Sequence, residues 1–401
     1  MNYHAKAIGP ESSHGLPVDL ADRISAVTKI AAVHAEAVDS AARYPAEAME
    51  ALKAQKLMGI LVPASLGGEE LTMADAAEIC FRLGQACASA GMIYAMHLVK
   101  LACIVNHGQS NAWQKNLMKR IISEQMLLGS STTEGMNGGN VRSSAAAILR
   151  NGPQITLERD ASVISYGAYA DAIVTTARRA EDAENSDQVL AVFLKEDYTL
   201  EGTSNWDTLG MRGTCSTGYR LKAHGVPDQL LPIPYARIHT QTMTPSAHIL
   251  WSSVWAGIAT AAVSKAELFV RKAMRASAGQ MPPGGMHLTK AKSKLRILRA
   301  LLNEATARYQ VAHRDEDKSA SLDYQTAMAL TKVEASEMAL EIVMTCYRTC
   351  GLAGYRNDGD VSIGRHLRDI LSSPIMINND RILASMGNAV LMSGVPTSLH
   401  A

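Results

Sequence analysis

The sequence predicts an α+β fold with an N-terminal helical domain, a central β-domain and a C-terminal four-helix bundle. Two observations lead to this prediction. Apolar residues recur every three or four positions at both ends of the chain, which is typical of amphipathic helices. Between these ends the apolar residues form short runs separated by glycine, proline or charged turns, which is typical of strands. We place the domains at residues 1–124, 125–238 and 239–401.

Each part of the chain supports its assignment. In the first part, "ADAAEICFRLGQACASAGMIYAMHLVKLACIV" alternates small alanines with larger apolar residues at helical spacing. The central part contains the short runs "SVISY", "DAIVTTA", "VLAVFL" and "GYRLKAHGV". The last part has long alanine- and leucine-rich periods, and the stretches "SAGQMPPGGMH" and "GLAGYRNDGD" must interrupt its helices because they contain proline and glycine.

The bulk composition indicates a soluble globular protein. The chain has 401 residues and is 47% hydrophobic, and we expect no apolar run of membrane length. Lysine and arginine total 39 against 38 for aspartate and glutamate, so no excess charge points to nucleic acid or to an anionic membrane. The N-terminus lacks the features of a signal or transit peptide, so we expect a cytoplasmic location. The six cysteines form no CxxC pair and are expected to be buried and reduced.

Local motifs exclude several classes of enzyme. The sequence has no GxGxxG after a strand, no P-loop, no HExxH and no GxSxG, and it gives no reason to expect a metal site. His97, within "YAMHLVK", is a candidate ligand or acid–base group. The alternative is that His97 is a hydrogen-bonded packing residue in an apolar helix.

Six motifs occur in one order along the chain, namely "LVPASLGG", "SSTTEGMNGGN", "VISYGAYADAIVTTAR", "WDTLGMRGTCS", "TCGLAGY" and "RHLRD". Together they resemble the acyl-CoA dehydrogenase family over nearly the whole chain. The resemblance implies FAD bound between the three domains, and a homodimer or homotetramer assembled through the bundles. It also implies an acyl thioester as substrate, on CoA or a carrier protein, and an electron acceptor as partner.

The resemblance assigns flavin contacts to small and hydroxyl residues, which let backbone N–H groups approach a polar ligand closely. The matching positions are Ser130, Thr132, Thr133, Gly138, Gly139, Ser165, Gly351 and Asn379. Thr132 and Thr133 would contact the flavin ring, and Gly138 and Gly139 would line the turn beside the pyrophosphate. Ser165 stands where the family has a threonine near the flavin N5.

Two arginines depart from the family pattern. Family members have an arginine followed by phenylalanine and glycine that reaches the FAD of a neighbouring subunit, and here "MRASAGQMPPGGM" offers only Arg275. Arg348 stands where the family commonly has glutamine before its glycine-rich turn, and an arginine there could bind a pyrophosphate by paired hydrogen bonds. A surface salt bridge is the alternative role of Arg348.

The catalytic base of the family is missing. Family members remove an α-proton with a glutamate in a tyrosine–glutamate–glycine–threonine stretch, and Ile377 of "PIMINND" falls on that glutamate. A minority of members supply the base from the helix that opens the bundle, but "IHTQTMTPSAHILWSSVWAG" contains no aspartate or glutamate. Losing a positioned base typically costs about 10²–10⁴ in rate. Asp380 and His97 are the candidate replacements, and a surface ion pair is the alternative role of Asp380.

Three functions remain open at this point. The first is an FAD-dependent dehydrogenase of an acyl thioester with an atypical or relocated base. The second is a two-component flavin-dependent monooxygenase of the same fold, which receives reduced flavin from a flavin reductase and needs no α-proton base. The third is a non-catalytic flavin-binding or structural subunit.

Overall fold

The computed structural model describes residues 18–134, 140–392, 395 and 397–398. Its first part is helical, with α1 (Val18–Ser40), α2 (Ala46–Ala54), α3 (Met73–Ala86), α4 (Ala88–His107) and α5 (Ala112–Glu124). Thr72 caps α3 in a reciprocal arrangement with Asp75, which satisfies two backbone N–H groups at the start of the helix. Asn111 accepts hydrogen bonds from the first turn of α5 in the same way.

The central part holds two sheets. One has the order β1-β4-β5, with β1 (Leu128–Ser131), β4 (Ala172–Arg178) and β5 (Gln188–Leu194). The other has the order β2-β3-β7-β6, with β2 (Leu149–Asn151), β3 (Gln154–Ile164), β7 (Thr217–Gly225) and β6 (Tyr198–Gly202). β1 pairs with β4 in parallel, and the other strand pairs of the two sheets are antiparallel. β5 is buried along its whole length, whereas β3 alternates between exposed and buried residues, which is typical of a strand with one solvated face.

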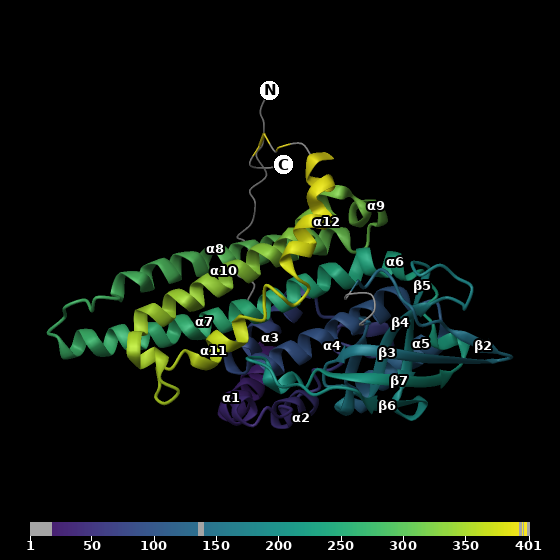
Figure 1. Cartoon of the computed structure of the whole chain (residues 1–401), viewed down its shortest axis with the longest axis horizontal. Helices are drawn as coiled ribbons and strands as arrows, with labels where there is room; N and C mark the ends of the chain where they lie inside the picture. The colour runs from purple at the N-terminus through teal and green to yellow at the C-terminus, as the bar shows by residue number, and fades with distance from the viewer. Residues whose placement is uncertain (1–17, 135–139, 393–394, 396, 399–401) are drawn as a thin grey trace.

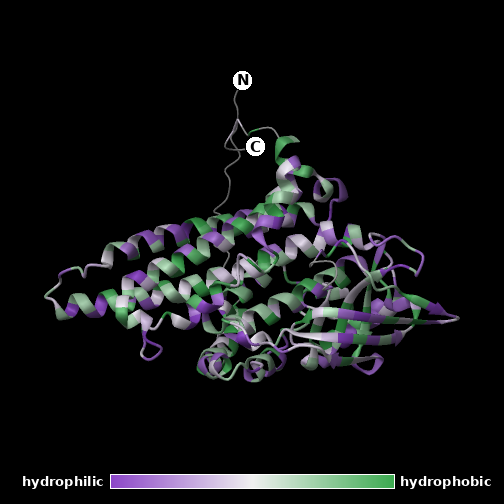
Figure 2. Ribbon diagram, viewed as in Figure 1, coloured by the Kyte–Doolittle hydropathy of each residue, from purple (hydrophilic) through white to green (hydrophobic). Residues whose placement is uncertain are grey.

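The last part is a set of long helices that run side by side (Figure 1). It contains α6 (Tyr235–Ile238), α7 (Thr244–Ala276), α8 (Gly285–Ala312), α9 (Glu316–Ala320), α10 (Leu322–Tyr355), α11 (Gly364–Ile370) and α12 (Asn379–Met392). A π-helical turn, His239–Met243, joins α6 to α7. The long helices carry hydrophilic and hydrophobic residues along their length, as expected of helices with one solvated face (Figure 2). The predicted α+β class and the order of its three parts are confirmed.

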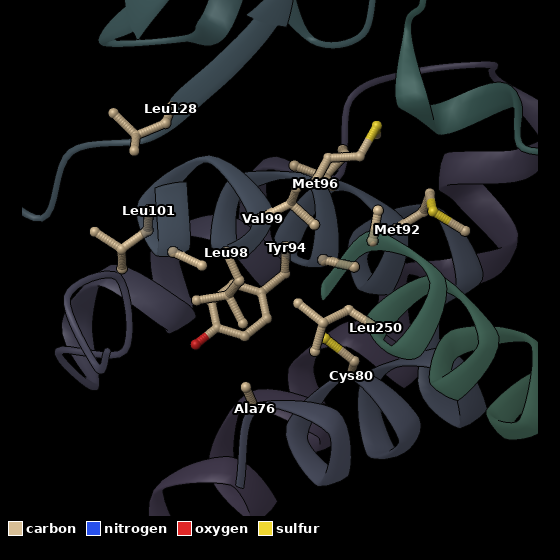
Figure 3. Packing of buried hydrophobic residues seen from close by; sticks show 14 of the residues in the cluster. Ala76, Cys80, Met92, Tyr94, Met96, Leu98, Val99, Leu101, Leu128 and Leu250 are labelled. Carbon is tan, nitrogen blue, oxygen red and sulfur yellow. The ribbon is translucent and has the colours of Figure 1, made fainter. Parts of the chain in front are cut away.

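The main core lies where α3, α4 and α7 meet. Figure 3 shows Ala76 and Cys80 of α3, Tyr94 of α4 and Leu250 of α7 packed together. The hydroxyl of Tyr94 is fully buried and donates to the carbonyl oxygen of Leu57 at 2.6 Å, so the polar group of this core residue is satisfied.

The expectation that the chain has no apolar run of membrane length is wrong. Two helical segments, Ala88–His107 and Tyr235–Ala276, are long and apolar enough to cross a membrane by length and composition. Within the described structure, 100% and 83% of their most apolar windows are buried against other parts of the chain. A helix that is hydrophobic on all sides can be the core helix of a large domain, and both segments occupy that position here.

Candidate active site

A cavity of about 80 Å³ lies where the helical parts meet the β-domain. It is lined from β1 and the following loop by Ser130 and Thr132, and from the turn before α12 by Ile377. These residues were predicted from two stretches far apart in the sequence, "SSTTEGMNGGN" and "PIMINND", and the fold brings them together. The cavity also receives side chains from α4, the π-helical turn and α7: Met96, Val99, Lys100, His239, Met243, Thr244, Ala247, His248 and Trp251.

The predicted flavin-binding loop begins at the end of β1. This strand is held by parallel pairing with β4, in which Ser130 lies opposite Val174 and Ser131 opposite Thr175. The hydroxyl of Thr133 accepts a hydrogen bond from Ser162 at 3.3 Å. Gly138 and Gly139, which were predicted to line the turn, lie outside the described residues.

Ser165 directly follows β3 and belongs to a chain of hydroxyl groups. Its Oγ lies 2.8 Å from Oγ of Ser216, which lies 2.8 Å from Oγ1 of Thr214. Thr214 donates in turn to the carbonyl oxygen of Met211 at 2.9 Å. Because each hydroxyl can donate and accept, this chain fixes the rotamer of Ser165 relative to the "LGMRGTCS" loop.

Asp369 of the "RHLRD" motif fastens that loop to α11. Its carboxylate accepts the backbone N–H of Met211 at 2.7 Å, and burial raises the pKa of Asp369 to about 6. A Cβ on Gly210 would lie 2.1 Å from the carbonyl oxygen of Arg368, so only glycine allows the loop to approach α11 this closely. Arg368 itself pairs with Asp39 of α1.

A buried lysine holds the turn that carries Ile377. Lys332 of α10 is 0% exposed and donates to the carbonyl oxygen of Ile377 at 2.7 Å and to Oδ1 of Asn379 at 2.6 Å. Asn379 also donates from Nδ2 to Glu337 at 2.7 Å. The amide of Asn379, predicted to contact the flavin, therefore makes hydrogen bonds to α10. Burial lowers the pKa of Lys332 to about 8.

Backbone strain gathers in these loops. Tyr166, Met211, Cys215 and Ile377 have φ values of 44°, 52°, 45° and 53°. Positive φ is uncommon for residues other than glycine, and for a β-branched residue such as isoleucine it is a genuine outlier. Such strain costs on the order of 1–3 kcal/mol per residue and is often found at functional sites.

The cavity also contains basic residues that the sequence reasoning missed. His248 bonds the carbonyl oxygen of Met328 through Nδ1 at 2.9 Å, which leaves Nε2 without a proton. Burial lowers the pKa of His248 to about 4 and that of His239 to about 3, so both imidazoles are neutral near pH 7. The stretch "IHTQTMTPSAHILWSSVWAG" contains no carboxylate, but it contains these two histidines. Their presence was the feature of the sequence that could have indicated a base here.

The two proposed replacement bases lie elsewhere. His97 is buried, and its Nε2 lies 2.8 Å from the carbonyl oxygen of Met58 while its Nδ1 accepts the backbone N–H of Leu128 at 3.0 Å. Both ring nitrogens are thus engaged by the backbone. Asp380 is exposed in the first turn of α12, where its backbone N–H bonds Oδ1 of Asn378.

The remaining predicted cofactor residues lie on the bundle. Arg275 is exposed in the last turn of α7, and Arg348 is exposed on α10. Gly351 interrupts α10 with a φ of 53°, as expected for a glycine-rich turn. Their predicted contacts with a flavin stay predictions.

A second, larger cleft of about 830 Å³ lies on the other side of the π-helical turn. Arg237 and Gln241 line it, together with Asn106 and His107 of α4 and Tyr309 of α8. None of the predicted site residues lines this cleft, so we place the active site at the smaller cavity.

The family assignment rests on two matches. Residues 21–125 match the family model described as "Acyl-CoA dehydrogenase, N-terminal domain", and residues 249–373 match "Acyl-CoA dehydrogenase, C-terminal domain". The two matched segments flank the β-domain and contain α4, Lys332 and α7 from residue 249 onward.

The chain belongs to the acyl-CoA dehydrogenase family.

Among relatives in this family, a cyclohex-1-ene-1-carbonyl-CoA dehydrogenase of Geobacter metallireducens is 23% identical over 372 residues, which are 91% of this chain and 94% of the relative. A 3-sulfinopropanoyl-CoA desulfinase of Paraburkholderia xenovorans is 25% identical over 183 residues, which are 45% of this chain and 47% of the relative. The shared fold extends to FMN-bound TdsC of Paenibacillus sp. A11-2, with a TM-score of 0.81, 19% identity, and coverage of 96% of this chain and 100% of that one. The latter is described as a dibenzothiophene monooxygenase.

The chain is thus a member of a flavoprotein family, and the cavity is lined by polar groups that could donate to the edge of a flavin ring or to its ligand. The indole Nε1 of Trp251 is buried with no hydrogen-bond partner among the described residues. The hydroxyl groups of Ser130 and Thr132 lie at the same cavity. Unpaired buried donors are costly, and a ring edge with carbonyl and imine acceptors would satisfy them.

Proposed function

We propose that the protein is an FAD-dependent oxidoreductase that acts on an acyl thioester, with an imidazole of α7 in the role that a glutamate has in its relatives. The observation that carries this proposal is the state of His248. Its Nδ1 bonds a backbone carbonyl, its Nε2 is free to accept a proton, and its side chain lines the cavity with Ile377. His248 is therefore the best-placed replacement for the missing base.

The basicity of His248 suits this role. Burial lowers the pKa of the imidazole to about 4. The imidazole is therefore uncharged near pH 7, which is the state in which it can accept a proton. When the imidazole takes the α-proton it becomes a cation, which would stabilise the enolate left on the thioester, whereas a glutamate that takes the proton becomes neutral.

The turn at Ile377 would polarise the substrate. Within the described parts of the chain, no hydrogen-bond acceptor is found for the backbone N–H of Ile377, and its carbonyl oxygen is fixed by Lys332. An N–H held in this way can donate to the thioester carbonyl and stabilise the charge that develops there. The flavin, when bound, would accept the hydride from the β-carbon.

The test is reduction of the bound flavin by substrate. The purified protein, loaded with FAD, is mixed anaerobically with short-chain acyl-CoA thioesters, and loss of the oxidised-flavin absorbance is followed. We expect reduction by at least one thioester. The variant His248→Ala should slow reduction about 10²–10⁴-fold. His224→Ala, which changes an exposed histidine on β7, serves as the control and should react like wild type.

The monooxygenase function is the second candidate, because no carboxylate is among the described residues that line the cavity. A monooxygenase would need none. If no thioester reduces the flavin, but the protein oxygenates an aromatic heterocycle when a flavin reductase supplies reduced flavin, this second function replaces the first. Flavin binding without either reaction would indicate a non-catalytic subunit.

A further inference from the structure

Lys100 is a buried ammonium group inside the cavity. It lies in the middle of the apolar helix α4, is 4% exposed, and lines the cavity together with Ile377 and His248. Burial lowers its pKa to about 8, so the side chain remains mostly protonated near pH 7. A buried positive charge is expensive unless a negative partner or several hydrogen bonds compensate for it.

The described residues offer little to offset the cost of burying the ammonium group of Lys100. The hydrogen bond found for the ammonium runs to the thioether sulfur of Met243 at 3.4 Å, and a thioether is a weak acceptor. Within residues 18–134 and 140–392, Lys100 forms no salt bridge to an aspartate or glutamate. The guanidinium of Arg159 has the same sign and disfavours the charged form of Lys100, so it lowers the pKa of Lys100 further.

The groups that share the cavity are also donors or neutral. His239 and His248 are uncharged near pH 7, and the indole N–H of Trp251 has no described partner. The cavity thus contains an ammonium group and an N–H donor, and among the described residues that line it no carboxylate accepts a hydrogen bond from them. This composition favours a ligand that brings acceptor oxygens and a negative charge.

The size of the cavity limits that ligand. Its volume is about 80 Å³, and one water molecule occupies roughly 30 Å³ in the liquid. The space therefore suits a short group of a few heavy atoms, such as a terminal carboxylate.

We propose that Lys100 binds an acidic group at the end of a short acyl chain, so that the substrates of this enzyme are CoA thioesters of short dicarboxylic or similar acids. This inference rests on the proposed function, because it assumes that an acyl thioester enters the cavity. Lys100 acts here as a specificity-determining residue: its ammonium group donates to the acidic group and takes no part in proton abstraction.

The experiment compares two thioesters of equal chain length. Binding of glutaryl-CoA and of valeryl-CoA to the flavin-loaded protein is measured anaerobically at pH 7 by titration calorimetry. We expect glutaryl-CoA to bind at least about tenfold more tightly, as a charge-assisted hydrogen bond in a buried site predicts. Lys100→Met should remove this preference and leave the Kd for valeryl-CoA within about threefold of wild type. Lys100→Arg, which keeps the charge, should retain part of the preference.

Lys119→Met, at an exposed position of α5, is the matched control and should bind both thioesters like wild type. Equal affinities of the wild type for the two thioesters would overturn the inference about Lys100 while leaving the proposed function intact. If Lys100→Met weakens the binding of both thioesters equally, the inference about Lys100 is likewise overturned and the proposed function stays intact. If wild type binds neither thioester, the proposed function fails and this inference fails with it. Should Lys100→Met not fold, the ratio of the two wild-type affinities decides the question.

Discussion

Ile377 is the residue that the motif resemblance aligns with the glutamate of the family. It has a φ of 53° and is 40% exposed at the cavity. The strained backbone is held by Lys332, which bonds the carbonyl oxygen of Ile377. The turn is thus preserved as a piece of backbone, while its side chain cannot accept a proton.

Restoring a carboxylate at this position should restore the base. We expect an acyl thioester, added anaerobically, to reduce the flavin of Ile377→Glu faster than the flavin of wild type. Partial burial would raise the pKa of the new carboxyl group and bring it nearer the working range of a general base. Ile377→Gln, with the same shape and no charge, is the control. If Ile377→Gln accelerates the reaction equally, the carboxylate is not acting as a base.

Wild-type behaviour can also contradict this assignment. A fast wild-type reaction that is stopped by Asp380→Asn or His97→Ala would show that one of those residues supplies the base, in place of His248.

Lys332 should stabilise both the fold and the turn. Lys332→Met leaves the carbonyl oxygen of Ile377 without its lysine donor, at a cost of about 1–3 kcal/mol, and leaves Oδ1 of Asn379 with only the 3.4 Å bond from Ser336. We expect a lower free energy of unfolding, measured by chemical denaturation, and weaker flavin binding. Lys290→Met, at an exposed position of α8, should change neither quantity.

The effect of Lys332 should depend on pH in a defined direction. Its pKa is about 8 in the folded protein and 10.5 in the reference state, so the unfolded chain binds more protons between these values. The stability of wild type relative to Lys332→Met should therefore increase as the pH rises from about 8 to 10.5. A difference that stays constant over this range would argue against a buried, depressed lysine.

Some residues of the site could be predicted from the sequence, and others could not. Ser130, Thr132 and Ile377 were predicted because they lie in recognisable motifs. Lys100 and Lys332 were not, because each stands alone inside an apolar helical run and its role depends on what faces it. Lys332 lies four residues after Met328 and three before Ala335, both buried, so helical periodicity alone could have placed it on the buried face.

At the scale of elements, the crossing of α3 and α7 is close enough to involve the backbone. A Cβ on Gly257 would lie 2.2 Å from the carbonyl oxygen of Phe81, and a Cβ on Gly84 would lie 2.4 Å from that of Val254. These two glycines let the helices approach on both sides of the contact. Sequence periodicity predicted both helices, but it could not predict which of their glycines meet, because that depends on the crossing geometry.

We therefore expect Gly257→Ala to destabilise the protein, although alanine is the better helix former. Overpacking of this kind costs typically about 1–3 kcal/mol. Gly387→Ala on α12 is the matched control: nothing lies within 4 Å of its added Cβ, so the substitution should stabilise the protein by about 0.5–1 kcal/mol. Thermal unfolding of the two variants should shift in opposite directions, and a shared direction would contradict the close crossing.

The π-helical turn is another element that sequence did not predict. Its residues His239 and Met243 line the cavity, whereas Gln241 lines the larger cleft. Such turns are rare and are often found at functional sites. Nothing in "HTQTM" distinguishes it from an ordinary helical turn. In the structure the turn contacts α4 through the bond between His107 and Thr242.

At the scale of the whole molecule, the end of α12 is the most exposed apolar segment of the bundle. Leu391 and Met392 are 85% and 78% exposed, and α12 projects from the other long helices (Figure 1). Contiguous apolar surface on a soluble protein commonly marks an interface. The predicted homo-oligomer would cover it, and would also allow Arg275 and Arg348 to reach the flavin of a neighbouring subunit.

We expect wild type to sediment as a dimer or larger species at low micromolar concentration. If α12 contributes to the interface, Leu391→Lys should shift the distribution towards monomer, because a charge would have to be buried on association. Leu149→Lys, which changes an exposed leucine on β2, should leave it unchanged and controls for added charge. A monomeric wild type would contradict the cross-subunit role of Arg348. An oligomer unaffected by Leu391→Lys would place the interface on another face of the bundle.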